Sequence, residues 1–164
     1  MREATQHARD STRRKKLTKT SIPTEVNGLS IPDQETITHG IGPGNLGAKM
    51  GILFVEVSAE RSVAVMPVAD NEQPYGLLHG GAYCVLGESL GSVSAAIHAG
   101  ENNYAVGIDI NATHTASATS GWVTAECRAI HLGGSLTVHE IVITNEAGRR
   151  CSTVRITNMI RTRR

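Results

Sequence analysis

The sequence predicts an α+β domain in which one curled antiparallel sheet wraps around a single long central helix. Residues 80–98 form a long run of small and apolar side chains, which is too long for a strand and typical of a buried helix. Segments on both sides of this run alternate apolar and polar side chains, as half-buried strands do. A chain of 164 residues suits one such domain, and no internal repeat is visible.

The beginning of the chain differs in composition from the rest. Residues 1–30 are polar, rich in Thr, Lys and Arg, and interrupted by proline and glycine. Because such a segment can bury little apolar surface, it predicts a flexible basic N-terminal extension over 1–30 and a single domain over 31–164. A short helix is favoured after Asp33, and the glycines and proline within 40–44 interrupt it.

The first strands are expected to form a hairpin. Residues 52–57 and 62–66 are rich in β-branched and other apolar side chains, and the segment 58–60 between them has the character of a turn. Proline at position 67 is expected to end the second strand, since it has no backbone N–H to donate.

The composition of the predicted helix favours close packing against the strands that follow it. The helix carries many Ala, Gly and Ser residues, and small side chains let a sheet approach a helix closely. Four strands are predicted after Gly100: 104–115, 121–130, 135–144 and 150–160. Short connections between them favour an antiparallel meander.

Composition excludes several function classes. The formal net charge is +1, from 16 basic and 15 acidic residues, so no strong field favours nucleic acid or an anionic membrane as a partner. The nearest candidate for a membrane span, 80–99, contains Glu88 and several serines and glycines, so a buried helix is the better interpretation. No apolar stretch of the secretory type follows the basic N-terminus.

Cysteine and histidine usage points to a reducing compartment and to no bound metal. The chain has three cysteines, an odd number, which argues against a disulfide framework and predicts a cytoplasmic location. Cys84, Cys127 and Cys151 are interpreted as structural residues. The seven histidines show no recognisable ligand spacing with cysteine or carboxylate, so neither a metal nor a cofactor is expected.

Glu88 is the one formal charge between Glu72 and Glu101, and apolar residues flank it on the predicted helix. Carboxylates are rarely buried without a partner, and a base or nucleophile held ready for catalysis is one explanation for such a residue. The alternatives are that Glu88 lies on an exposed edge of the helix, or that Arg128 or Arg155 neutralises it.

The triplet His79-Gly80-Gly81 stands where the predicted helix begins. A helix N-terminus offers unpaired backbone N–H groups and a partial positive charge, and glycine lets a ligand oxygen approach them. This is the chemistry of an oxyanion site. The alternative is that the glycines only permit a tight turn and that His79 is a surface or capping residue.

The helix separates these two features. Gly81 and Glu88 are seven residues apart, which corresponds to about 10 Å along a helix axis. Within one chain both groups are too far apart to meet on one carbonyl. If they serve one reaction, a second subunit is expected to bring its own helix alongside, so the active site requires a dimer.

Two segments, 73–81 and 88–92, together resemble the hotdog-fold acyl-CoA thioesterases of the phenylacetate-degradation and hydroxybenzoyl-CoA type. They read Gln-Pro-Tyr-Gly-Leu-Leu-His-Gly-Gly and Glu-Ser-Leu-Gly-Ser. The segments 106–114 and 131–133 are also similar to those that follow the central helix in that family. The resemblance covers about residues 50–160 and implies a hotdog fold, in agreement with the predicted order of helix and strands.

The resemblance also implies residue roles. Glu88 would be the nucleophile or general base, and His79 and Gly80 would orient and polarise the thioester carbonyl, with Gln73 and Ser92 in supporting roles. It further implies that Gln73, His79 and Gly80 come from one subunit of a homodimer and Glu88 and Ser92 from the other. A tetramer built as a dimer of dimers is expected.

Substrate-binding roles are predicted for five further residues: Gly81, Asn111, His114, His131 and Gly133. The family often carries basic residues after the segments that end at His114 and Gly133, where they hold the phosphates of CoA. Here 115–120 and 134–136 contain no positive charge. Other basic residues that could hold the phosphates are Arg128, Arg149, Arg150, Arg155 and those of the basic termini. A protein-bound pantetheine is an alternative to CoA.

Two other functions remain as alternatives on the same fold. One is a hotdog dehydratase or hydratase that acts on acyl thioesters, and the other is a non-catalytic acyl-CoA binding module. The position of Glu88 within the helix after His-Gly-Gly favours hydrolysis over dehydration. An aromatic acyl group is expected from the resemblance alone.

Overall fold

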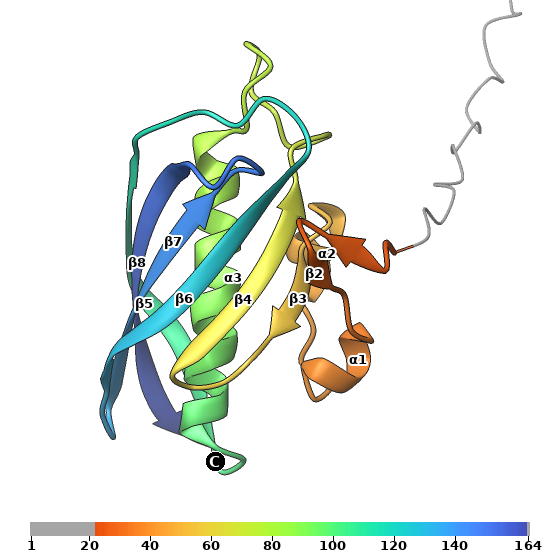
Figure 1. Ribbon diagram of the computed structural model, residues 1–164. Helices are drawn as coiled ribbons and strands as arrows, with labels where there is room; N and C mark the ends of the chain where they lie inside the picture. The colour runs from red at the N-terminus through yellow and green to blue at the C-terminus, as the bar shows by residue number, and fades with distance from the viewer. Residues whose placement is uncertain (1–21, 164) are drawn as a thin grey trace, which may run out of the picture.

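The computed structural model describes residues 22–163, and a long central helix lies against one large antiparallel sheet (Figure 1). The elements in chain order are β1 (Glu25–Val26), β2 (Leu29–Ser30), α1 (Gln34–Ile37), α2 (Gly44–Lys49), β3 (Leu53–Glu56), β4 (Arg61–Pro67), α3 (Gly80–Ala99), β5 (Asn103–His114), β6 (Trp122–Leu132), β7 (Leu136–Thr144) and β8 (Arg150–Thr162). The predicted α+β class, the β3–β4 hairpin and the long helix are confirmed.

The six-stranded sheet has the order β3-β4-β6-β7-β8-β5, and every neighbouring pair is antiparallel. The meander predicted for the last four strands is therefore wrong in part. Strands β6, β7 and β8 form it, but β5 pairs with β8 at the far edge and β6 pairs with β4. The connection 115–121 crosses the end of the sheet (Figure 1). Seven extended residues reach about 23 Å, which exceeds the roughly 14 Å across three strand spacings.

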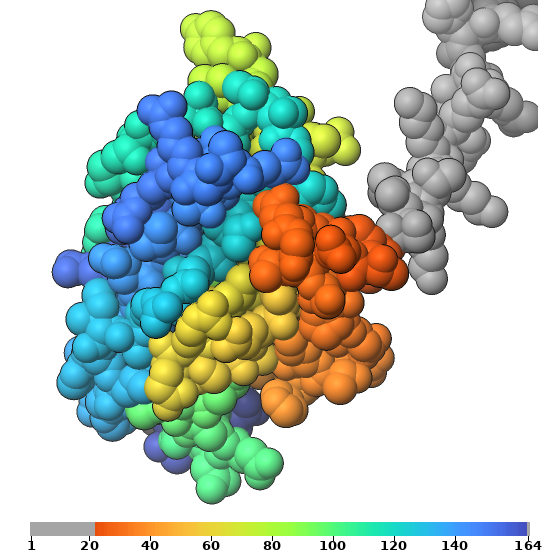
Figure 2. Space-filling model, in the orientation of Figure 1, coloured from red at the N-terminus to blue at the C-terminus, as the bar shows by residue number. Residues whose placement is uncertain are grey.

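The first described residues depart from the expected extension over 1–30. Strands β1 and β2 form a hairpin, and its turn residues Asn27 and Gly28 have φ of 51° and 74°. Val26 packs with Leu53 and Val65, and the orange hairpin lies against the yellow β3–β4 region in Figure 2. The ordered part thus begins before residue 31. Residues 1–21 of the expected extension lie outside the described part of the chain.

Helix α3 is defined at both ends by its capping residues. His79 is the N-cap, with φ −64° and ψ 137°, and its side chain accepts a hydrogen bond from the Gly81 N–H. Gly100 ends the helix with φ of 74°, a conformation that glycine adopts without a steric penalty. The helix has 20 residues and is therefore about 30 Å long.

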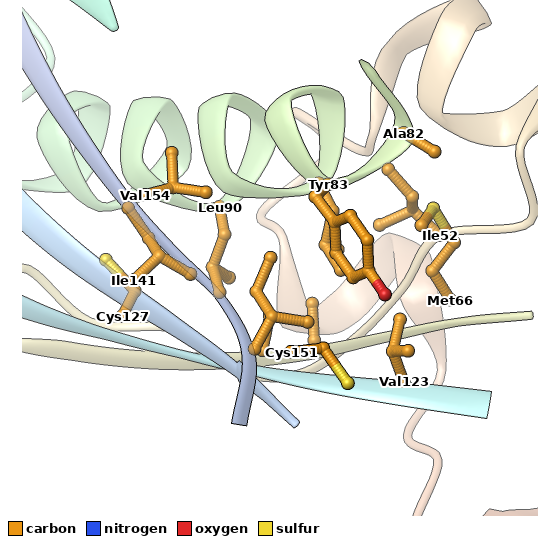
Figure 3. Close-up of a cluster of buried hydrophobic side chains, with 14 of the residues drawn as sticks. Ile52, Met66, Ala82, Tyr83, Leu90, Val123, Cys127, Ile141, Cys151 and Val154 are labelled. Carbon is orange, nitrogen blue, oxygen red and sulfur yellow. The ribbon is translucent and has the colours of Figure 1, made fainter. Parts of the chain in front are cut away.

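The core lies between α3 and the concave face of the sheet. Figure 3 shows Tyr83 and Leu90 extending from the helix toward Ile141, Cys151 and Val123 on the strands. Apolar burial of this kind supplies most of the driving force for folding. The expected small-residue helix face is present, since a side chain at Gly87 or Gly91 would collide with β8.

We expect Gly91→Ala to lower the free energy of unfolding by about 1–3 kcal/mol. The new methyl group would overlap Cγ2 of Ile156, a branched side chain that is itself fully buried. This overlap outweighs the roughly 1 kcal/mol that alanine gains over glycine inside a helix. Urea unfolding measures the change. Gly134→Ala is the matched control, because a Cβ there meets nothing within 4 Å; equal stability of both variants would contradict this packing.

A second prediction concerns pH. His139 is fully buried on β7, and burial lowers its pKa, partly offset by the Ala59 carbonyl 3.0 Å from Nε2 and reinforced by nearby His98. An unfolded histidine takes up a proton near pH 6.5. Below about pH 6.5 the unfolded state therefore binds more protons than the folded state. The free energy of unfolding consequently decreases as the pH is lowered.

Unfolding of wild type and His139→Gln in urea at about pH 7.5 and about pH 5.5 tests this effect. Wild type is expected to lose more stability on acidification than the variant, because glutamine has no ionisable group. The same loss in both proteins would remove His139 as the cause.

Candidate active site

The N-terminus of α3 presents two different hydrogen-bond donors. His79 Nδ1 accepts from the Gly81 N–H at 2.8 Å, so the ring proton is on Nε2, and the ring is exposed. The Gly80 N–H belongs to the first turn, which has no intrahelical acceptor. The two donors available to a substrate oxygen are therefore His79 Nε2–H and Gly80 N–H. The Gly81 N–H, predicted as part of the substrate site, is already occupied by His79.

Gly80 lies in close contact with a histidine side chain. A Cβ at this position would lie 3.1 Å from His114 Nε2, so the imidazole of His114 lies directly against the start of the helix. His114 is held there by Ser152 Oγ, 3.0 Å from Nδ1, and by the Tyr83 ring at a centroid distance of 5.2 Å. The structure thus places His114 next to Gly80 at the start of the helix, and its predicted substrate-binding role stays a prediction.

The loop before the helix positions Gln73. The Gln73 N–H donates to the Leu77 carbonyl at 2.7 Å, and the Gln73 carbonyl accepts from the Gly76 N–H at 2.9 Å. The loop is joined to the helix by the His79 N–H, which donates to the Asn71 carbonyl at 2.9 Å. Asn71 is anchored in turn by its side chain, which donates to two backbone carbonyls. Asn71 was not identified from the sequence.

Glu88 and Ser92 lie one turn apart on α3, on the same face of the helix. In the single chain Glu88 is exposed, and it borders β5: a Cβ at Gly107 would lie 3.6 Å from Glu88 Oε1. The alternative that Arg128 neutralises Glu88 is wrong, because Arg128 Nε bonds Glu126 at 2.6 Å. Among residues 22–163 no ion pair involves Glu88.

The remaining predicted substrate residues lie elsewhere in this chain. His131 and Gly133 stand at the opposite end of α3, where His98 Nε2 is 3.0 Å from the Gly133 carbonyl oxygen. Asn111 is opposite Arg155 in the β5–β8 register. Because its neighbours on β8, Val154 and Ile156, face the core, Arg155 and Asn111 face away from the helix. Their substrate roles stay predictions.

Two of the three cysteines are disfavoured as thiolates by their surroundings. Burial raises the pKa of the Cys84 thiol, and the negative charge of Glu88 raises it further. Burial also raises the pKa of Cys127 to about 12. Both are therefore protonated thiols near neutral pH and poor nucleophiles. In the described part of the chain all three cysteines are free.

Within 22–163 there is no group of three or more His, Cys, Asp or Glu side chains arranged to hold a metal ion. No helix in this range is both long enough and apolar enough to span a membrane.

A long helix held inside a curled six-stranded antiparallel sheet is the hotdog fold. Residues 75–152 match the family model described as the thioesterase superfamily. The proofreading thioesterase EntH of Klebsiella pneumoniae is 44% identical over 110 residues, which are 66% of this chain and 80% of that relative. The 1,4-dihydroxy-2-naphthoyl-CoA hydrolase of Escherichia coli is 40% identical over 123 residues, 74% of this chain and 90% of that relative.

A solved thioesterase structure has the same fold. A mutant of the Pseudomonas aeruginosa thioesterase PA1618 superposes with a TM-score of 0.73 at 36% identity, covering 80% of this chain and 96% of that one. The chain belongs to the thioesterase superfamily. It is an enzyme of the thioester-hydrolase class, which confirms the resemblance at that level.

Proposed function

We propose that this chain hydrolyses an acyl-CoA thioester, with an aromatic acyl group, to the free acid and CoA. The observation that carries the proposal is the pair of donors at the start of α3, His79 Nε2–H and Gly80 N–H, on the helix that also carries Glu88. The 40% identity to an enzyme named as a hydrolase of an aromatic acyl-CoA supports the substrate class.

The two donors would stabilise the negative charge that develops on the thioester oxygen, a contribution worth a factor of about 100 to 1000 per donor. Glu88 would either take a proton from water, whose oxygen then bonds the carbonyl carbon, or attack that carbon itself. If water attacks, the C–S bond breaks and the sulfur takes the proton that Glu88 received. If Glu88 attacks, breakage of the C–S bond leaves an acyl anhydride on Glu88, which water hydrolyses to the free acid, and a proton from that water converts the thiolate to CoA thiol. Gln73 and Ser92 would have supporting roles and help to position the substrate and the attacking water.

The site is proposed to be composed of two subunits of a homodimer. His79 and Glu88 are nine residues apart on α3, or about 14 Å along the axis. Strand β5 forms an edge of the sheet next to Glu88, and Val106, Ile108 and Ile110 on it are exposed. An exposed apolar edge strand favours pairing with a second chain. A tetramer built from two such dimers remains a prediction.

Arg149 and Arg150 are proposed to hold the CoA phosphates. Arg149 and Arg150 lie where β8 begins, and the Arg150 carbonyl accepts a bond from Thr115 Oγ1, next to His114 in sequence. Arg128 is less suited, since it already bonds Glu126. We also propose a cytoplasmic location, which the free cysteines support.

A panel of acyl-CoAs tests the reaction. Phenylacetyl-, hydroxybenzoyl- and dihydroxynaphthoyl-CoA are compared with aliphatic acyl-CoAs by thiol release and by mass analysis of the acid. Release of thiol and acid in equal amounts is expected, fastest for the aromatic substrates. Formation or loss of a double bond without thiol release would instead identify the dehydratase or hydratase alternative, and binding without turnover would identify the non-catalytic module.

A further inference from the structure

A buried amide lies beneath the Glu88 turn of α3. Asn158 on β8 is fully buried, although its neighbours on the same face of the strand, Val154 and Ile156, are apolar core residues. Burying an amide costs free energy unless its polar atoms are hydrogen-bonded. Asn158 therefore needs an explanation that packing alone does not supply.

The carboxamide oxygen of Asn158 accepts a hydrogen bond from Ser92 Oγ at 3.3 Å. The strand next to it is open at this point, because Gly107 is opposite Asn158 in the β5–β8 register. A Cβ at Gly107 would lie 3.6 Å from Glu88 Oε1 and 3.8 Å from Asn158 Oδ1. The Glu88 carboxylate and the Asn158 amide, which bonds the Ser92 hydroxyl, thus both border the position that a side chain at 107 would occupy, with Cδ1 of Ile156 3.7 Å from the same point.

We infer that Asn158 is a positioning residue that orients the Ser92 hydroxyl for the hydrolytic water, an inference that rests on the proposed function. A serine hydroxyl has one hydrogen and two lone pairs. Because Asn158 Oδ1 takes the hydrogen, the lone pairs of Ser92 Oγ are left to accept a hydrogen bond from water.

The consequence for the reaction is a fixed direction for that water. One of its hydrogens is held by Ser92 Oγ, and the other is transferred to Glu88 as the water oxygen bonds the carbonyl carbon. The C–S bond then breaks, and the proton returns from Glu88 to the thiolate. Without Asn158 the Ser92 hydroxyl can rotate its hydrogen toward the water. It would then donate to the water oxygen instead of accepting a hydrogen bond from the water.

The test is a double-mutant cycle in the full-length protein, with Asn158→Leu, Ser92→Ala and the double variant assayed by thiol release. Asn158→Leu is expected to lower kcat about tenfold with KM changed less than about twofold, because only the water is misdirected. In the Ser92→Ala background the same substitution is expected to have no further effect on kcat. If Asn158→Leu does not fold, Asn158→Ala replaces it in the same cycle.

Thr137→Val is the matched control. Thr137 is opposite Asn158 on β7, is equally buried, and its hydroxyl has no hydrogen-bond partner among the described residues. It makes no bond to Ser92, so its replacement should leave kcat within about twofold of wild type. A merely structural role for Asn158 would lower kcat equally in both Ser92 backgrounds, and that result overturns the inference, as does an unchanged kcat in Asn158→Leu. Absence of thiol release by the wild-type protein on every acyl-CoA would instead remove the proposed function itself, and hydrolysis that persists in Glu88→Gln would remove the role of Glu88 in it.

Discussion

Glu88→Gln is expected to lower kcat for acyl-CoA hydrolysis by a factor of about 1000 or more. The amide has the size of the carboxylate but can neither accept a proton from water nor attack a carbonyl. Because the Glu88 side chain is exposed in the single chain and is in no ion pair among residues 22–163, the substitution should leave folding intact. Thiol release at saturating substrate measures the loss, and the thermal midpoint checks the fold.

Glu101→Gln is the control for this variant. Glu101 is also an exposed carboxylate, in the turn that follows α3, and it lies far from the donors at the start of the helix. Its replacement should leave kcat unchanged. Glu88→Gln protein that hydrolyses acyl-CoA within a few-fold of wild type would exclude the carboxylate from the chemistry, whatever its position.

Local patterns predicted the elements well, because each element is determined by its own side chains. The small residues of α3 predicted both the helix and its close approach to the sheet, and Gly87 and Gly91 are in contact with β8 as this requires. The position of β5 beside β8 depends on pairing between distant strands, which alternation along one strand does not specify. The β1–β2 hairpin was missed although Asn27-Gly28 is a typical hairpin turn.

The sequence suggested candidate site residues, but their arrangement in space came from the structure. Glu88 was conspicuous as an isolated charge, but its exposure in the single chain depends on how the sheet packs around α3, which the helix sequence alone does not specify. Asn158 was overlooked, although it is two residues after the buried Ile156 on a strand and therefore on the same face. Alternate residues of a strand share one face, and applying this rule to polar residues as well as apolar ones would have identified Asn158 as buried.

Two inactive variants are expected to restore activity to each other when they share a dimer. Glu88→Gln removes the carboxylate, and His79→Asn removes the Nε2–H donor while keeping a side chain that caps helices well. If each site combines His79 of one subunit with Glu88 of the other, a mixed dimer contains one intact site and one doubly altered site. Random assembly of equal amounts makes half of the dimers mixed, so about a quarter of wild-type activity should return.

Co-expression of the two variants with different affinity tags gives this mixture. The doubly tagged species purified from it should show about half of wild-type activity, since each mixed dimer has one intact site of two. Glu88→Gln combined with Ser92→Ala is the control, because both residues are expected on the same side of the site. That pair should show only the average activity of its parents. The contrast follows from the length of α3: the roughly 14 Å between His79 and Glu88 cannot shrink within one rigid helix. Absence of recovery in the first mixture would mean that the carboxylate and the donors do not act on one carbonyl across the dimer.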